Sequence, residues 1–187
     1  MQIKDILKKV TEELASCFDN LNEDELQALE GAVRGADRIF VAAAGRSLLA
    51  IRGMAMRLMH MGFTAYVVGE TVTPAIQPDD LLIIASGSGS TGTLTVMAEK
   101  CKKVGAKLAL ITTRPESPIG QLADIVVEVK AASTKVEKSA YTSIQPGANT
   151  FEQGVLLIGD AIVIDIISAD SLDEKNVELM KRHANLE

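Results

Sequence analysis

The residues with the clearest chemical potential form one run of small polar side chains: Ser86, Gly87, Ser88, Gly89, Ser90 and Thr91. An apolar segment precedes the run and a segment with helical spacing of apolar residues follows it, so the run should join a strand to a helix. The two glycines allow a tight turn, the hydroxyl groups offer donors, and a helix start presents unpaired N–H groups. The pattern predicts a site for a phosphate monoester, with a plain Gly/Ser turn as the alternative.

A second junction has similar chemistry. Gly45, Arg46 and Ser47 follow the first predicted strand, so Ser47 can donate at a helix start and Arg46 can reach an anion. An ordinary helix N-cap is the alternative. The run at 86–91 has the spacing of neither GxxxxGK[ST] nor GxGxxG, which argues against these nucleotide-binding motifs. Because adjacent strand ends converge on one crevice of a parallel sheet, the two junctions favour a shared anion site.

Two further residues are candidates for proton transfer. Glu152 falls in the first turn of a long predicted helix, where the helix dipole stabilises an anion. A carboxylate so placed can abstract a carbon-bound proton next to a carbonyl, although a glutamate is common in a first turn. His60 ends a predicted helix, where it can serve as a general acid or base or simply interact with the helix dipole.

Alternating strands and helices should position these residues. The predicted strands cover residues 38–43, 64–68, 81–85, 107–113 and 125–129. Apolar strands separated by helices predict parallel pairing with right-handed crossovers. We therefore expect an α/β fold, a doubly wound three-layer sandwich around a five-stranded parallel sheet.

Helices should flank this core. Residues 3–18 carry an apolar stripe, and a second helix should start at Asn22 with Glu25 as its capping-box partner. Residues 130–149 read as a loop. Thr150, with Gln153 as its partner, should cap a helix that runs to about Ser168 and is apolar on most of its surface, which predicts burial partly in a subunit interface.

A final helix should start at Ser171, with Glu174 as its capping partner. The chain then divides into an N-terminal helical segment 1–35, an α/β core 36–168 and a C-terminal helix 169–187, all within one domain.

Composition excludes several classes of protein. The chain has 187 residues, 47% of them hydrophobic and 24% charged, which fits one compact domain and argues against disorder. A formal net charge of -6 and an aromatic content of 3% argue against nucleic-acid binding. Cys17 and Cys101 are too few for a disulfide framework or a metal cage. Because the sequence contains no cluster of ligands, we expect neither a metal nor a cofactor. The N-terminus lacks a signal-peptide core and the most apolar stretch is too short for a membrane span, which predicts a cytoplasmic protein.

The two junctions together resemble the sugar isomerase (SIS) domain family. In that family the serines and threonine of an SxSGxT motif hold the phosphate of a phosphosugar, and the match here is Ser86, Ser88, Gly89 and Thr91. The stretches AMRLMHMGF at 55–63 and SIQPGANTFEQ at 143–153 resemble the 6-phospho-3-hexuloisomerases within that family. The resemblance covers nearly the whole chain.

The resemblance implies an isomerase that interconverts D-arabino-hex-3-ulose 6-phosphate and D-fructose 6-phosphate through a cis-enediol. It implies Glu152 as the proton acceptor and His60 as an acid or base, from the same or a neighbouring subunit. It also implies a homotetramer and a role in the ribulose monophosphate pathway of formaldehyde fixation.

Two alternatives remain open at this point. One is a non-catalytic SIS module that senses a phosphosugar, and the other is an SIS isomerase for another phosphosugar, such as arabinose 5-phosphate or sedoheptulose 7-phosphate. Turnover separates the first alternative from an enzyme, and the substrate tested separates the second.

Overall fold

The computed structural model describes residues 2–132, 141–147, 149–168 and 172–186. Within them lies one sheet of five parallel strands in the order β2-β1-β3-β4-β5. The strands are β1 (Ile39–Ala43), β2 (Ala65–Val67), β3 (Leu81–Ala85), β4 (Lys107–Thr112) and β5 (Ile125–Glu128). The predicted sheet is confirmed, with strand ends that differ from the expected ones by one residue at most.

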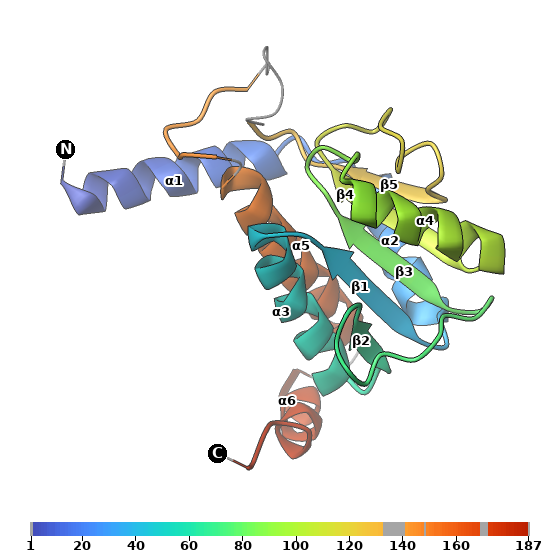
Figure 1. The fold of residues 1–187 in the computed structure, drawn as a ribbon. Helices are drawn as coiled ribbons and strands as arrows, with labels where there is room; N and C mark the ends of the chain where they lie inside the picture. Colours follow the sequence, from blue (N-terminus) through green and yellow to red (C-terminus); the bar gives the residue numbers. More distant parts are fainter. Residues whose placement is uncertain (1, 133–140, 148, 169–171, 187) are drawn as a thin grey trace.

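Helices cover both faces of this sheet (Figure 1). The helices that pack on the sheet are α2 (Glu23–Gly35), α3 (Arg46–His60), α4 (Gly92–Val104) and α5 (Asn149–Ser168). The remaining two pack on helices instead: α1 (Ile3–Phe18) on α5, and α6 (Leu172–Lys181) on α3 and α5. Side chains alternate across β1, so that Ile39 and Val41 join a core with α2, α3 and α5, whereas Phe40 and Ala42 join a core with α4. The three-layer α/β sandwich is therefore confirmed.

The order of the strands creates a crevice between β1 and β3. After β1 the chain enters α3 on one face of the sheet, and after β3 it enters α4 on the other face. The two strands end in register, with Ala43 paired to Ala85. Ligands of open α/β sheets bind at such a point, outside the carboxyl ends of strands whose connections leave in opposite directions.

Two glycines let α3 and α5 pack closely. A Cβ at Gly159 would lie 2.8 Å from the Cβ of Met54, and one at Gly53 would lie 2.7 Å from Cδ1 of Leu156. The predicted burial of α5 is met partly within the chain, through residues such as Ile158. Leu157 and Ile164 of the same helix stay 41% and 59% exposed. No helix among the described residues is both long and apolar enough to cross a membrane.

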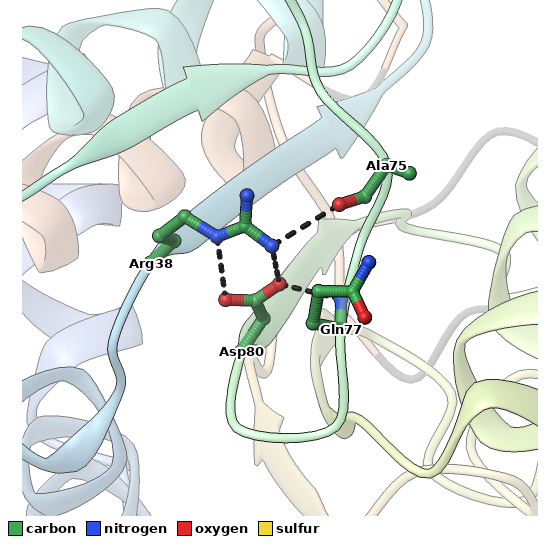
Figure 2. A network of polar contacts seen from close by, with 4 residues as sticks. All are labelled: Arg38, Ala75, Gln77 and Asp80. Carbon is green, nitrogen blue, oxygen red and sulfur yellow. Dashed lines mark hydrogen bonds and ion pairs between the residues drawn. The ribbon is translucent and has the colours of Figure 1, made fainter.

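An ion pair fixes the opposite edge of the sheet, where β1 and β3 begin (Figure 2). Arg38 donates from Nε and Nη2 to the two carboxylate oxygens of Asp80, at 2.9 and 2.6 Å, and Nη2 also donates to the carbonyl of Ala75. Asp80 is buried and accepts a further bond from the amide of Gln77. This bidentate pair ties the loop before β3 to the start of β1.

The predicted capping boxes are wrong in their partners. Asn22 caps α2 by accepting from the amide of Asp24, but Glu25 accepts instead from the amide of Glu128 in β5. α5 already includes Asn149, and the hydroxyl of Thr150 donates to Glu13 of α1 rather than capping α5. In each case the side chain forms a tertiary hydrogen bond in place of the predicted hydrogen bond within its own helix start. The predicted cap at Ser171 lies outside the described residues.

Candidate active site

A cavity of about 420 Å³ lies at the crevice between the ends of β1 and β3. Its walls come from the β1–α3 junction, the β3–α4 junction and the start of α5. The lining residues are Ala44, Gly45, Arg46, Ser47, Ala85, Ser86, Gly87, Ser88, Thr91, Leu94, Gly147, Phe151 and Glu152. This volume falls within the range typical of small-molecule sites, roughly 300–1,000 Å³.

The β3–α4 junction forms a turn that its own hydrogen bonds stabilise. The amide of Gly89 donates to the carbonyl of Ser86 at 3.0 Å and to its Oγ at 3.2 Å, and the amide of Ser90 donates to Oγ of Ser88 at 3.4 Å. Thr91 is the N-cap of α4, yet its side chain makes no capping hydrogen bond. The first amides of α4 and the hydroxyl of Thr91 are thus available to an anion at the helix start.

Only glycine fits at position 89 of this turn. Gly89 has a φ of +57°, and a Cβ there would lie 1.9 Å from Oγ of Ser117. Its carbonyl accepts from the amide of Ile119, so the turn is fastened to the segment that follows β4. The backbone therefore approaches Ser117 more closely than any side chain would permit.

Gly87 fastens the other side of the turn. Its carbonyl accepts hydrogen bonds from Oγ1 of Thr113 at 2.8 Å and from the amide of Thr113 at 3.2 Å. A Cβ at Gly87 would meet the ring of Phe151 at 3.3 Å, so the turn packs directly on the first residues of α5. The β3–α4 turn and the start of α5 are therefore positioned against each other.

The β1–α3 junction supplies the cation. Gly45 is the N-cap of α3 with a φ of +59°, and no side chain caps this helix start. Arg46 and Ser47 follow in the first turn of α3 and line the cavity. Among the described residues that line the cavity, Arg46 is the only cation and Glu152 the only anion.

Glu152 faces the cavity from the first turn of α5, and its side chain is only 16% exposed. Nε of Arg46 lies 2.5 Å from Oε2 of Glu152, and the Arg46 side chain itself is 60% exposed. The site thus pairs one carboxylate with one largely exposed guanidinium, in a cavity that hydroxyl groups and helix-start amides also line. This set can bind a phosphorylated compound and move one of its protons.

His60 does not line this cavity. It ends α3, whereas Arg46 begins it, so about 20 Å of helix separates His60 from the site. His60 is buried, stacks on His183 with ring centroids 5.3 Å apart, and has Arg57 at 3.4 Å from Nδ1. Burial, with help from Arg57 and His183, lowers the pKa of His60. The imidazole is therefore neutral at pH 7.

Most of the predicted site residues meet in one cavity. Arg46, Ser47, Ser86, Gly87, Ser88, Thr91 and Glu152 all line it. Gly89 shapes the turn from behind, Ser90 is exposed beside it, and His60 lies at the far end of α3. Five lining residues were not singled out from the sequence as site residues: Ala44, Ala85, Leu94, Gly147 and Phe151. Phe151 had a signal, since it directly precedes Glu152. The described residues contain no group of His, Cys, Asp and Glu that could hold a metal ion.

Known proteins share this chain's sequence and fold. The SIS domain family model matches residues 32–148. The 3-hexulose-6-phosphate isomerase of Mycobacterium gastri is 41% identical, over 97% of this chain and 89% of its own length. That of Bacillus subtilis is 36% identical over the full length of both chains. A crystal structure from Methanococcus jannaschii, for which the function of 3-hexulose-6-phosphate isomerase is inferred, superimposes with a TM-score of 0.83 at 32% identity, covering 98% of this chain and 99% of the other. The chain belongs to the SIS domain family and, within it, to the group of 3-hexulose-6-phosphate isomerases.

Proposed function

We propose that this protein is an isomerase that interconverts D-arabino-hex-3-ulose 6-phosphate and D-fructose 6-phosphate. The observation that carries the proposal is the shared cavity, in which the Glu152 carboxylate faces the hydroxyl and amide cradle of the β3–α4 turn. A non-catalytic sensor needs the cradle alone. The similarity to 3-hexulose-6-phosphate isomerases supports this substrate over another phosphosugar.

The cradle would hold the 6-phosphate. Ser47, Ser88 and Thr91 offer hydroxyl donors, the first turns of α3 and α4 offer amides, and Arg46 adds a guanidinium. Ser86 is buried, and its hydroxyl oxygen already accepts from Gly89, so its part is to shape the turn and to donate its own proton. A local arrangement of this kind binds one phosphate even in a chain with a net charge of -6.

Glu152 would move the proton between C2 and C3. The carboxylate removes the proton from C2 of the hex-3-ulose, and the C2–H electron pair forms the C2=C3 bond of a cis-enediol while the C3 oxygen gains a proton. The O2 proton then replaces the one that O3 gained, carried by solvent or by the proposed acid–base residue His60. The C2 carbonyl forms, and the C2=C3 electron pair takes the proton back from Glu152 at C3. Dipoles of the nearby helix starts stabilise the oxyanion that develops on the way.

His60 would act on the sugar oxygens of a neighbouring subunit's site. Within one chain the length of α3 keeps it away from the cavity, so this role needs a homo-oligomer, and we propose a tetramer. Exposed apolar residues on two helices support association, among them Leu49 and Met56 of α3 and Ile164 of α5, which are 66%, 58% and 59% exposed.

The proposed setting is the cytoplasm, with the reaction serving the ribulose monophosphate route of formaldehyde fixation. Cys17 and Cys101 are buried free thiols, which is compatible with a reducing compartment. Burial raises the pKa of Cys101 to about 11, so this thiol stays protonated and unreactive.

The decisive assay supplies the purified protein with hex-3-ulose 6-phosphate and detects fructose 6-phosphate. Turnover is expected, and Glu152→Gln should lower kcat by about 100-fold or more while phosphosugar binding persists. Tight binding without turnover would establish the sensor instead. Faster turnover of arabinose 5-phosphate or sedoheptulose 7-phosphate would show that the protein is an isomerase for that phosphosugar instead.

Two further measurements test His60. Sedimentation at micromolar concentration should show a tetramer, and a monomer would exclude a role for His60 in a neighbour's site. His60→Ala should lower kcat in the tetramer. If kcat stays near that of the unaltered protein, His60 only packs at the end of α3.

A further inference from the structure

The carboxylate of Glu13 on α1 is the centre of a polar network that reaches the start of α5. Among the described residues, four donate to it: Ser143 Oγ at 2.6 Å, the Ile144 amide at 2.7 Å, Gln145 Nε2 at 3.3 Å and Thr150 Oγ1 at 3.4 Å. All four donors lie between residues 143 and 150, at least 130 residues after Glu13 in the sequence. Glu13 therefore joins the N-terminal helix to the segment that leads into α5.

The donors also bind one another. The amide of Gln145 donates to Oγ of Ser143 at 2.9 Å, and Nε2 of Gln145 donates to Oγ1 of Thr150 at 3.1 Å. Thr150 is only 5% exposed. Glu13 thus accepts from a group of side chains that are already interlinked, which favours one arrangement of the segment.

Glu13 is an anion in this network. Burial tends to raise its pKa, but the hydrogen bonds from Ser143, Ile144, Gln145 and Thr150 outweigh burial and lower the pKa. The carboxylate also lies at the N-terminal end of α5, where the helix dipole favours negative charge. Both effects are strongest while Glu13 is charged.

The segment that Glu13 holds is a wall of the cavity. Gly147 lines it, and Phe151 and Glu152 follow Thr150 by one and two residues. The same end of α1 packs on α5, because Leu14 and Cys17 are buried and Phe18 lies 3.8 Å from where a Cβ of Gly154 would be. The other end of α1 projects from the body of the protein (Figure 1), with Ile3 77% exposed.

We propose that Glu13 is a positioning residue for the isomerase: its hydrogen bonds to residues 143–145 and Thr150 fix the first turn of α5 and so aim the Glu152 carboxylate into the cavity. This inference rests on the proposed function. Glu13 itself does not line the cavity.

The test compares Glu13→Gln with Glu12→Gln, which changes an exposed carboxylate one position earlier on the same helix. Glu13→Gln should lower kcat by about 10- to 100-fold, as expected for a misplaced catalytic group, and change KM by less than about threefold. The phosphate cradle does not contact Glu13, so KM should be spared. Glu12→Gln should leave both constants unchanged. Equal constants in the two variants would overturn the proposal.

A double variant separates positioning from general loss of structure. If Glu13 acts through Glu152, adding Glu13→Gln to Glu152→Gln should lower kcat less than about twofold further. A full additional loss would overturn the proposal. If Glu13→Gln does not fold, Ser143→Ala offers a second test, because it removes the closest donor to Glu13 and leaves α1 intact. This variant should lower kcat several-fold. An unchanged kcat would count against the positioning role of Glu13.

Hydrogen exchange tests whether Glu13 holds residues 143–147 in place, and it needs no turnover. In Glu13→Gln the amide of Ile144, which donates to Glu13, should exchange faster than in Glu12→Gln, and residues 143–147 should lose protection together. Unchanged protection would overturn the proposal that Glu13 holds this segment, whatever the substrate is. Conversely, an unaltered protein without isomerase activity but with this protection pattern would refute the proposed function alone.

Discussion

Arg46 and Glu152 come from the first turns of two different helices, and their side chains meet with Nε of Arg46 2.5 Å from Oε2 of Glu152. The guanidinium therefore contacts the proposed base inside the cavity that the proposed phosphate cradle also lines. A bound phosphate would offer Arg46 a second anion with matching geometry. Because Arg46 is 60% exposed, its side chain has room to turn toward that phosphate and release Glu152.

Arg46→Gln should raise KM by roughly 10-fold, because it removes a charge-assisted hydrogen bond to the phosphate. The inhibition constant of inorganic phosphate should rise in parallel, whereas kcat should change little. Arg46→Lys keeps the charge without the bidentate guanidinium, so its KM and its inhibition constant for phosphate should lie between those of the unaltered protein and Arg46→Gln. Steady-state kinetics of the three proteins check this. A large loss of kcat at constant KM would instead place Arg46 in the proton-transfer step.

Gly89→Ala should disrupt the cradle. Position 89 has a φ of +57°, and the new Cβ would collide with Ser117, whose Oγ lies 1.9 Å from its ideal place. The turn must shift, so we expect KM and the inhibition constant of phosphate to rise by about 10-fold or more, alongside a loss of stability of about 1–3 kcal/mol. Gly35→Ala is the control, because a Cβ there meets nothing within 4 Å and Gly35 ends α2, which does not line the cavity. An unchanged KM in Gly89→Ala would show that the turn does not bind the phosphate.

The cradle was predictable because its signals are local. A run of Ser, Gly and Thr between an apolar strand and a helix determines both the turn and its chemistry. Strand order then places Arg46 and Ser47 beside the run, since parallel strands end at one edge. A pattern formed by a few consecutive residues therefore predicts the folded structure well.

The failures share one physical cause. Glu25 and Thr150 look like members of capping boxes, but Glu25 binds an amide of β5 and Thr150 binds Glu13, some 137 residues away. A carboxylate or hydroxyl near a helix start has several possible partners of similar energy, and only the tertiary fold decides among them. For the same reason the network around Glu13 left no trace in the sequence.

Gly159→Ala should destabilise the protein although alanine favours helices. The added Cβ would lie 2.8 Å from the Cβ of Met54 and 3.5 Å from its Cα, so α3 and α5 must move apart. Overpacking of this kind costs about 1–3 kcal/mol, which corresponds to roughly 2–4 °C in Tm for each kcal/mol. Thermal unfolding checks the prediction.

Two other glycines serve as its controls. A Cβ at Gly31 of α2 meets nothing within 4 Å, so Gly31→Ala should stabilise by about 0.5–1 kcal/mol. Gly53→Ala faces only the end of the Leu156 side chain, which is 39% exposed and can swing away, so its cost should be smaller than that of Gly159→Ala. If all three variants unfold at the same temperature, α3 and α5 are not in close contact.

Asp124→Asn should remove a contribution to stability that depends on pH. Partial burial tends to raise the pKa of Asp124, but hydrogen bonds from Lys102 Nζ at 2.5 Å and from the Leu108 amide at 2.8 Å outweigh it and lower the pKa. A carboxylate with a lowered folded-state pKa stabilises the fold fully above its ordinary value of 3.8 and ceases to do so as the pH falls through the folded value. The free energy of unfolding, from denaturant titrations, should therefore be lower in Asp124→Asn at neutral pH. The difference from the unaltered protein should vanish in acid. Asp79→Asn, in the exposed loop before β3, should have little effect at either pH. A difference that stays constant with pH would mean that the Asp124 carboxylate does not hold the start of β4 through its charge.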